Sequence, residues 1–292
     1  MIRYLSHSQI DKNRWDQCID NACNSYVYAK SWYLDIVSPK WDALVNDDYS
    51  KVMPLTRKSR YGLLYLIQPK FTQQLGIFST LPLTKEDVQE FLDKIPLKFI
   101  WCDINLNFQN PVDRSNNISF LDNYELELGI PYDEIYKNYN RSTRYNISYT
   151  KRHELVLEFN PGIDLFFDNL VTNSKMEMPP IAVKQLRRII ETAVQKGTGE
   201  AIVCRSKQGN ILGGAFFLYS SKRIIYLVSF SNAEGRDLSA MFMIIDHVIK
   251  TNAGKEMIFD FEGSMIPGIA DFIKGFGATL INYPRFRKKL FL

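Results

Sequence analysis

One order of strands and helices occurs twice in this chain, and this recurrence limits its possible folds more than any other feature. Strand-like runs at 42–46, 61–68 and 98–105 have counterparts at 201–204, 223–230 and 257–262. The first residues of these pairs lie 159, 162 and 159 positions apart, from Asp42 to Ala201, Tyr61 to Arg223 and Lys98 to Met257. An offset this steady predicts a duplicated unit.

The boundary between the two copies is predicted at 107–118, which is rich in Asn, Pro and Ser and has no hydrophobic periodicity. The second copy also contains a predicted long polar helix at 131–152 and an amphipathic helix at 181–194. The sequence therefore predicts an α/β (α+β) fold with two domains, 1–120 and 121–292. Each domain is expected to be a mixed twisted sheet flanked by helices.

Composition indicates a globular protein with a large core, since 46% of the 292 residues are hydrophobic and 13% are aromatic. A net charge of +4 is too balanced to indicate a general nucleic-acid binder. The three histidines share no metal-ligand spacing, so no metal is expected. Scattered cysteines, the lack of a signal-peptide pattern and the lack of a long apolar run predict a cytoplasmic protein without a membrane span.

The loop at 231–239 is the best candidate for an anion site. It follows the strand 223–230 and leads into an apolar helix, whose first N–H groups and positive dipole end would face the loop. An ordinary polar loop is the alternative. The matching loop around Gly76 has no basic residue after its glycine, so the first domain is expected to be degenerate. The candidate residues are Phe230, Ser231, Asn232, Gly235, Arg236, Ser239 and Ala240.

Two carboxylates on the following strand, Asp260 and Glu262, are candidates for a general base. They alternate with phenylalanines along 257–262, so both are expected to point to one face. Such a base could take a proton from an attacking amine. A structural ion pair is the alternative, and Asp103 at the matching place in the first copy fits either role.

A basic and aromatic surface is predicted on the helix at 131–152. Its cationic and tyrosine side chains could hold a phosphorylated substrate, a nucleotide or an RNA end. For most of these residues a solvated helix face is the alternative. The residues chosen as substrate-binding candidates are Arg141, Arg144 and Asn146.

Two short motifs resemble those of GNAT-type acyl-CoA transferases. The loop 232–240 looks like a loosened form of their pyrophosphate loop, and 269–277 is similar to the segment that closes their domain. Tandem domains of this kind resemble the Fem-type (FemAB-like) family of acyl and aminoacyl transferases, which includes enzymes that build peptidoglycan cross-bridges. Trp32, the segments 68–71 and 73–76, and the segment 141–147 add to this likeness, which covers nearly the whole chain.

The resemblance implies an N-acyltransferase that moves an acyl group from acyl-CoA, such as acetyl-CoA, to an amine acceptor. The acceptor would be a small molecule or a cell-wall precursor, attacking directly in a cleft between the domains, with the donor carbonyl aligned near Phe230 and polarised by a main-chain N–H. A tRNA partner is not favoured, because the long charged heptad hairpin of many tRNA-dependent relatives is missing from the sequence. The alternatives are an aminoacyl-tRNA-dependent Fem-type transferase and a non-catalytic binding protein that kept the fold.

Overall fold

The computed structural model describes residues 1–173, 178–263 and 267–289. The chain forms two compact units, one of Met1–Asp122 with the chain from Ile281 onward, the other of Asn123–Leu280. The sequence analysis placed the last residues in the second domain. The structure places them with the first unit, because β14 (Thr279–Lys289) pairs antiparallel with β7 (Phe99–Asn105) and so satisfies its main-chain hydrogen bonds there.

The strands of the first unit lie in two sheets. An antiparallel sheet has the order β1-β2-β3-β6, while β4, β5, β7 and β14 are neighbours in a mixed sheet in which β5 and β7 are parallel. The strand bounds are β1 Ile2–Leu5, β2 Asp42–Asn46, β3 Lys51–Leu55, β4 Arg57–Arg60, β5 Leu63–Ile67 and β6 Phe78–Ser79.

Helix α3 (Lys85–Asp93) precedes β7 and supplies much of this unit's core. It begins with a capping box, in which Thr84 Oγ1 accepts from the N–H of Asp87 and the carboxylate of Asp87 accepts from the N–H of Thr84. Its buried face packs against residues of β3, β5 and β7. The other helices of the unit are η1 His7–Gln9, α1 Lys12–Asn21, η2 Val27–Ala29 and α2 Ser31–Val37.

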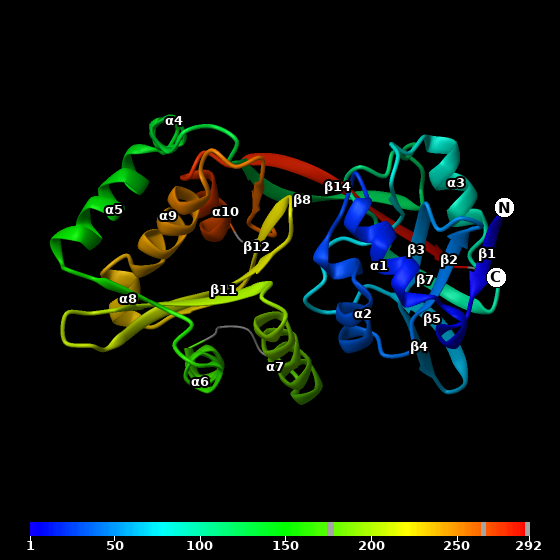
Figure 1. Ribbon diagram of the computed structural model, residues 1–292, viewed down its shortest axis with the longest axis horizontal. Helices are drawn as coiled ribbons and strands as arrows, with labels where there is room; N and C mark the ends of the chain where they lie inside the picture. The colour runs from blue at the N-terminus through cyan, green and yellow to red at the C-terminus, as the bar shows by residue number, and fades with distance from the viewer. Residues whose placement is uncertain (174–177, 264–266, 290–292) are drawn as a thin grey trace. The chain divides into compact units, whose positions relative to one another are not determined.

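The strands of the second unit form a mixed sheet in the order β13-β12-β11-β10-β9, with the end of β8 paired to β13. Figure 1 shows α6 and α7 on one side of these strands and α9 on the other. The strand bounds are β8 Ile118–Glu127, β9 Val156–Phe159, β10 Gly199–Arg205, β11 Ile211–Tyr219, β12 Arg223–Ser231 and β13 Ile258–Asp260. The helix bounds are α4 Tyr132–Lys137, α5 Arg141–Arg152, α6 Ile163–Asn173, α7 Pro180–Gln195, α8 Ala233–Asp237, α9 Ala240–Asn252 and α10 Pro267–Lys274.

Among the named strands that the structure describes, each unit has a parallel pair, and the two pairs match at one position before the register of β5 and β7 shifts after Leu64. Leu64 of β5 pairs with Phe99 of β7, and Ile224 of β12 pairs with Phe259 of β13. Both partners lie 160 positions further along in the second unit, since 224 minus 64 and 259 minus 99 give the same number. The predicted α/β fold with two domains, each containing a mixed sheet with flanking helices, is confirmed.

The predicted helix at 131–152 is in fact two helices, α4 and α5, and this prediction was wrong. Asn140 interrupts the helix with an extended main chain, and its side chain accepts a hydrogen bond of 2.7 Å from the N–H of Thr143. Its own N–H donates to the carbonyl of Gly275 at 2.9 Å, after the end of α10. An N-cap and a tertiary contact therefore outweigh the continuous polar pattern.

Candidate functional site

A cavity of about 400 Å³ lies beside the second half of β12. The parallel pairing of β12 with β13 ends at Ile225 and Asp260, whereas β12 continues to Ser231. The apolar wall of the cavity comes from β12, α9 and α10 and includes Tyr226, Phe230, Met241, Phe242, Ile269 and Phe272. Its polar side includes Ser231, Gly235, Arg236 and Ser239. Five of the seven residues predicted for the anion site therefore line one cavity.

The predicted loop contains a short helix, α8, which Asn232 and Gly235 build. The side chain of Asn232 accepts from the N–H of Gly235 at 2.7 Å and donates to the carbonyl of Ile211 at 2.8 Å. A Cβ added to Gly235 would lie 1.9 Å from the carbonyl oxygen of Leu212. The glycine thus allows α8 to approach β11 closely, and its N–H is already bonded within the protein.

The sequence analysis expected N–H donors at the start of the helix after the loop, and the first turn of α9 has such groups next to Ser239. Ser239 is its N-cap, with a left-handed φ of 61° and no side-chain capping bond. The N–H groups of Ala240 and Met241 therefore begin a helix of 13 residues, where helix geometry provides no internal acceptor. Ala240 itself is buried, so its methyl group belongs to the core and only its main chain is a candidate donor.

Arg236 brings a positive charge to the edge of the same cavity. Its Nη1 donates a hydrogen bond of 2.6 Å to the carbonyl of Ser231, which orients the exposed guanidinium group. A guanidinium group has five N–H donors, so the others remain for a ligand. Helix start and arginine together suit an anion such as a phosphate group.

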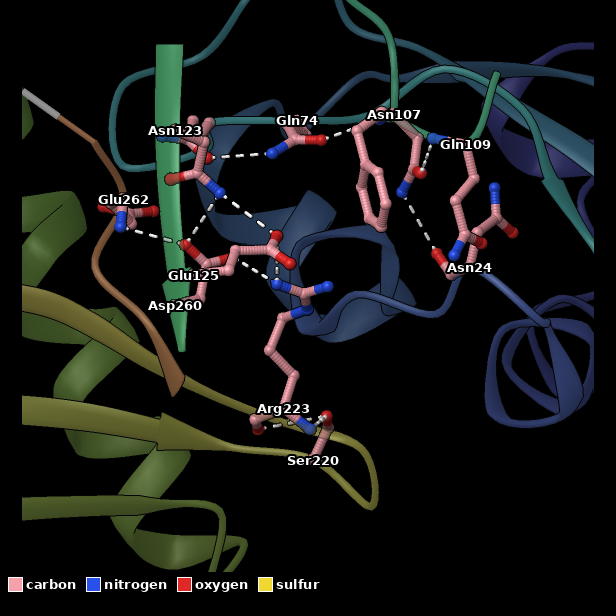
Figure 2. Close-up of polar contacts among 12 residues, drawn as sticks. Asn24, Gln74, Asn107, Gln109, Asn123, Glu125, Ser220, Arg223, Asp260 and Glu262 are labelled. Atoms are coloured by element: carbon pink, nitrogen blue, oxygen red, sulfur yellow. Dashed lines mark hydrogen bonds and ion pairs between the residues drawn. The ribbon is translucent and has the colours of Figure 1, made fainter. Parts of the chain in front are cut away.

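Asp260 does not lie free for proton transfer, because it belongs to a buried ion cluster (Figure 2). Its Oδ2 and Oε1 of Glu125 accept from Nη1 of Arg223 at 2.7 and 2.6 Å. All three side chains are at most 8% exposed. The carboxylate of Asp260 is therefore committed to a structural charge pair, which was the alternative stated for it.

Glu262 lies in a different setting from the one that the sequence predicted. Strand β13 ends at Asp260, and Glu262 lies beyond it with a left-handed φ of 58°, so the predicted strand alternation of the two carboxylates was wrong. Within the described part of the chain, its Oε1 is buried without a hydrogen-bond partner. Burial raises the pKa of this carboxyl group to about 8.

The three substrate-binding candidates all lie on α5. The side chain of Asn146 accepts a hydrogen bond of 3.0 Å from Ser239 Oγ, whereas Arg141 and Arg144 are exposed. Next to these two arginines, the ring of Tyr145 stacks on Tyr149, and the guanidinium of Arg152 lies over both rings. The structure thus joins Asn146 to the cavity loop and leaves the two arginines on a surface with stacked tyrosines.

In the first unit, the matching positions are filled by contacts within the protein. The side chain of Gln74 is buried and accepts from the N–H of Phe108 at 2.9 Å, and a Cβ on Gly76 would meet Asn110 Oδ1 at 2.3 Å. Asp103 forms a two-pronged ion pair with Arg285, with both distances 2.6 Å. These side chains are therefore engaged within the first unit.

The sequence analysis did not name most of the cavity's apolar wall. The rings of Phe242 and Phe272 meet edge to face at 4.8 Å between centroids, across α9 and α10. Their positions carried a usable signal, because Phe242 follows the cap of α9 by three residues and Phe272 lies inside the motif-like segment 269–277.

Over residues 1–173, 178–263 and 267–289, no three His, Cys, Asp or Glu side chains gather to hold a metal ion. No helix in the same ranges has the length and hydropathy needed to cross a membrane.

No protein-family model and no curated protein matches this chain by sequence. Solved structures do match it. FemX superimposes over 97% of this chain and 96% of its own, with a TM-score of 0.71 at 12% identity. This chain has a Fem-type tandem GNAT-like fold. Two other solved structures share the fold. L-PGS from Bacillus licheniformis matches with a TM-score of 0.54 at 12% identity, over 95% of this chain and 92% of its own. A tandem GNAT protein from the clavulanic acid biosynthesis pathway matches with a TM-score of 0.51 at 10% identity, over 100% of this chain and 99% of its own.

Proposed function

We propose that this protein is an N-acyltransferase that moves an acyl group from acyl-CoA to an amine on a small molecule or a cell-wall precursor. The observation that carries the proposal is the cavity beside the part of β12 that continues after β13 and its pairing end at Asp260 and Ile225. The start of α9 and Arg236 border that cavity with positive charge.

The residues around the cavity fit the two chemical parts of coenzyme A. Its phosphate groups require N–H donors and cations, which the first turn of α9 and Arg236 supply. Its pantetheine arm can pack against an apolar wall, which Phe230, Phe242 and Phe272 supply in part. The cavity volume also lies in the range of roughly 300 to 1,000 Å³ that small-ligand sites occupy.

A bulge in β12 provides a candidate donor for the carbonyl oxygen of the acyl group. Phe216 of β11 pairs with Val228 and Phe217 pairs with Tyr226, so Leu227 is an extra residue in β12. An extra residue lies outside the regular ladder of hydrogen bonds. We expect the main-chain N–H at this position to stabilise the negative charge that develops on the carbonyl oxygen during attack.

Glu262 would act as the general base for the acceptor amine. The amine nitrogen bonds to the thioester carbonyl carbon, the carbon–sulfur bond breaks, and the thiol of coenzyme A leaves with a proton. Glu262 accepts the proton that the amine loses and passes it to the leaving thiolate or to solvent. A carboxyl group whose pKa burial raises to about 8 is well matched to this task near neutral pH.

Thermal denaturation with coenzyme A tests the donor assignment. A ligand that binds only the folded state raises the melting temperature. We expect coenzyme A to raise the melting temperature more than equimolar ATP does. ATP has phosphates and adenine but lacks the pantetheine arm that the apolar wall would hold. Equal shifts, or no shift with coenzyme A, would reject the assignment.

The second candidate is an aminoacyl-tRNA-dependent transferase, and the exposed face of α5 favours it. This helix carries four cationic residues and no acidic one, and Arg152 lies over the stacked rings of Tyr145 and Tyr149. Such surfaces bind RNA by charge and stacking. This candidate predicts tRNA binding that weakens steeply with salt and is lost when Arg141 and Arg144 are both changed to alanine.

A non-catalytic binding protein is the remaining alternative. It predicts that coenzyme A binds, yet no thiol is released from acetyl-CoA when a panel of amines is supplied. Thiol release by the wild type that Glu262→Gln abolishes would support the transferase with Glu262 as its base, whereas binding without release by the wild type would support the binding protein.

A further inference from the structure

The carboxylate of Asp260 makes two different kinds of contact through its two oxygens. Oδ2 accepts from the guanidinium of Arg223 at 2.7 Å. Oδ1 accepts from the side-chain amide of Asn123 at 3.0 Å and from the main-chain N–H of Glu262 at 2.9 Å. One oxygen is therefore held by a charge, while the other holds the main chain of the candidate base (Figure 2).

The contact with Glu262 closes a turn at the end of β13. An aspartate side chain that accepts from the N–H two residues later forms an Asx-turn, which reverses the chain locally. Glu262 has a left-handed φ of 58°, which is a strained main chain for a residue other than glycine. A strained residue of this kind keeps its conformation only when its neighbours fix it.

Asp260 can fix this turn because the surrounding cluster immobilises it. It is 1% exposed, and its partners Arg223 and Asn123 are buried as well. Glu125 accepts from the other side of the same guanidinium nitrogen at 2.6 Å, so the arginine is held between two carboxylates. The described contacts anchor the Asp260 side chain from β12 and β8, the two strands on either side of β13.

We propose that Asp260 is a positioning residue for Glu262. Its Oδ1 accepts the hydrogen bond that the Glu262 N–H donates, and this bond keeps Glu262 Oε1 buried and, among the residues that the structure describes, without a hydrogen-bond partner. The inference rests on the proposed function for the role of Glu262 as a base. The hydrogen bond itself does not depend on which acyl donor the protein uses. Asp260 thus takes no proton itself. The sequence analysis named both Asp260 and Glu262 as candidates for the base. We now assign the base role to Glu262 and the positioning role to Asp260.

The test follows the ionisation of Glu262 by carbon-13 NMR of glutamate-labelled protein, with its signal assigned by loss in Glu262→Gln. In the wild type we expect the Glu262 carboxyl to titrate near pH 8. Asp260→Ala removes the hydrogen bond, so Glu262 should become solvated and titrate close to pH 4.3, the ordinary value for glutamate. Asp260→Asn keeps an acceptor oxygen for the N–H and should restore titration near that of the wild type.

Glu125→Gln is the matched control, because it removes a carboxylate from the same guanidinium without touching Glu262. We expect it to lower stability and to leave the Glu262 titration unchanged. A folded Asp260→Ala protein in which Glu262 still titrates near pH 8 would overturn the proposal. So would a shift of equal size in Glu125→Gln, since that would indicate a general effect of the cluster.

A measurement on the wild type keeps the proposal testable if Asp260→Ala does not fold. The hydrogen bond predicts that the amide of Glu262 exchanges with solvent at least 100-fold more slowly than an unstructured amide. Unprotected exchange would overturn the proposal. Because neither experiment uses coenzyme A, failure of the donor assignment and failure of this inference give separate results.

Discussion

The hydroxyl group of Ser239 donates a hydrogen bond of 3.0 Å to the side-chain oxygen of Asn146. This bond joins α5 to the residue that begins α9, at a position where the main chain is left-handed. It therefore helps to fix the direction in which the first N–H groups of α9 point. The sequence analysis placed the two residues in different sites, and the structure makes them neighbours.

Asn146→Ala should weaken coenzyme A binding about 3- to 10-fold, because a single hydrogen bond contributes about 1 kcal/mol to holding the α9 start in place. Calorimetric titration measures this change. Ser148→Ala is a suitable control, since Ser148 lies on the same helix and bonds only locally to the carbonyl of Arg144 among the contacts described. Equal affinities of the Asn146→Ala protein and the wild type would contradict the role of the bond.

The stability of the protein should depend on pH through Glu262. Its pKa is about 8 in the folded state and about 4.3 when unfolded. Between these values the folded state retains a proton that the unfolded state has lost, so the contribution is full below about pH 4 and declines as the pH rises towards 8. The loss amounts to about 1.4 kcal/mol per pH unit within that window.

Urea denaturation at several pH values checks this prediction against Glu262→Gln, which has no ionisable group at the position. The stability of the wild type should fall relative to the variant between about pH 5 and pH 8. Parallel pH dependences for the two proteins would show that the carboxyl group is not held in a protonated state.

Arg223→Ala should destabilise the protein by about 3 to 5 kcal/mol, because it leaves the buried carboxylates of Glu125 and Asp260 without their shared cation. Chemical denaturation measures the loss. Arg187→Ala provides the comparison, since its ion pairs with Asp164 and Glu191 are exposed and should be worth less than about 1 kcal/mol. Similar losses of stability in both variants would contradict the claim that the buried ion pairs of Arg223 matter more than the exposed pairs of Arg187.

Gly235→Ala should destabilise the protein by about 1 to 3 kcal/mol, because the added methyl group would lie 1.9 Å from the Leu212 carbonyl oxygen and push α8 away from β11. Gly129→Ala is the control. Its Cβ would meet nothing within 4 Å, so we expect a change within about 0.5 kcal/mol. An unchanged midpoint for Gly235→Ala would mean that the close approach is not required.

Elements with strong local patterns could be predicted from the sequence. The apolar strand β12 ends one residue beyond its predicted range of 223–230, and the predicted apolar helix follows the loop 231–239 as α9. The duplication was visible because strand order and spacing both repeat. The cavity residues of the loop 231–239 followed from their place between a strand and a helix.

Features that depend on tertiary contacts could not be predicted. The break before α5 requires the carbonyl of Gly275, which lies far along the chain from Asn140. Likewise, the pairing of Asp260 with Arg223 and Glu125 joins three strands, and no local pattern indicates it. These contacts show which of the two candidate carboxylates is held in an ion pair within the part of the chain that the structure describes.

Calorimetric titration of coenzyme A into the wild type, Arg236→Ala and Arg60→Ala tests the central claim most directly. Arg60 is an exposed arginine on β4 and controls for loss of charge. We predict that the wild type and Arg60→Ala bind alike and that Arg236→Ala binds about 10-fold more weakly, as expected for one charge-assisted hydrogen bond. The absence of binding to the wild type, or equal binding by all three proteins, would contradict the account.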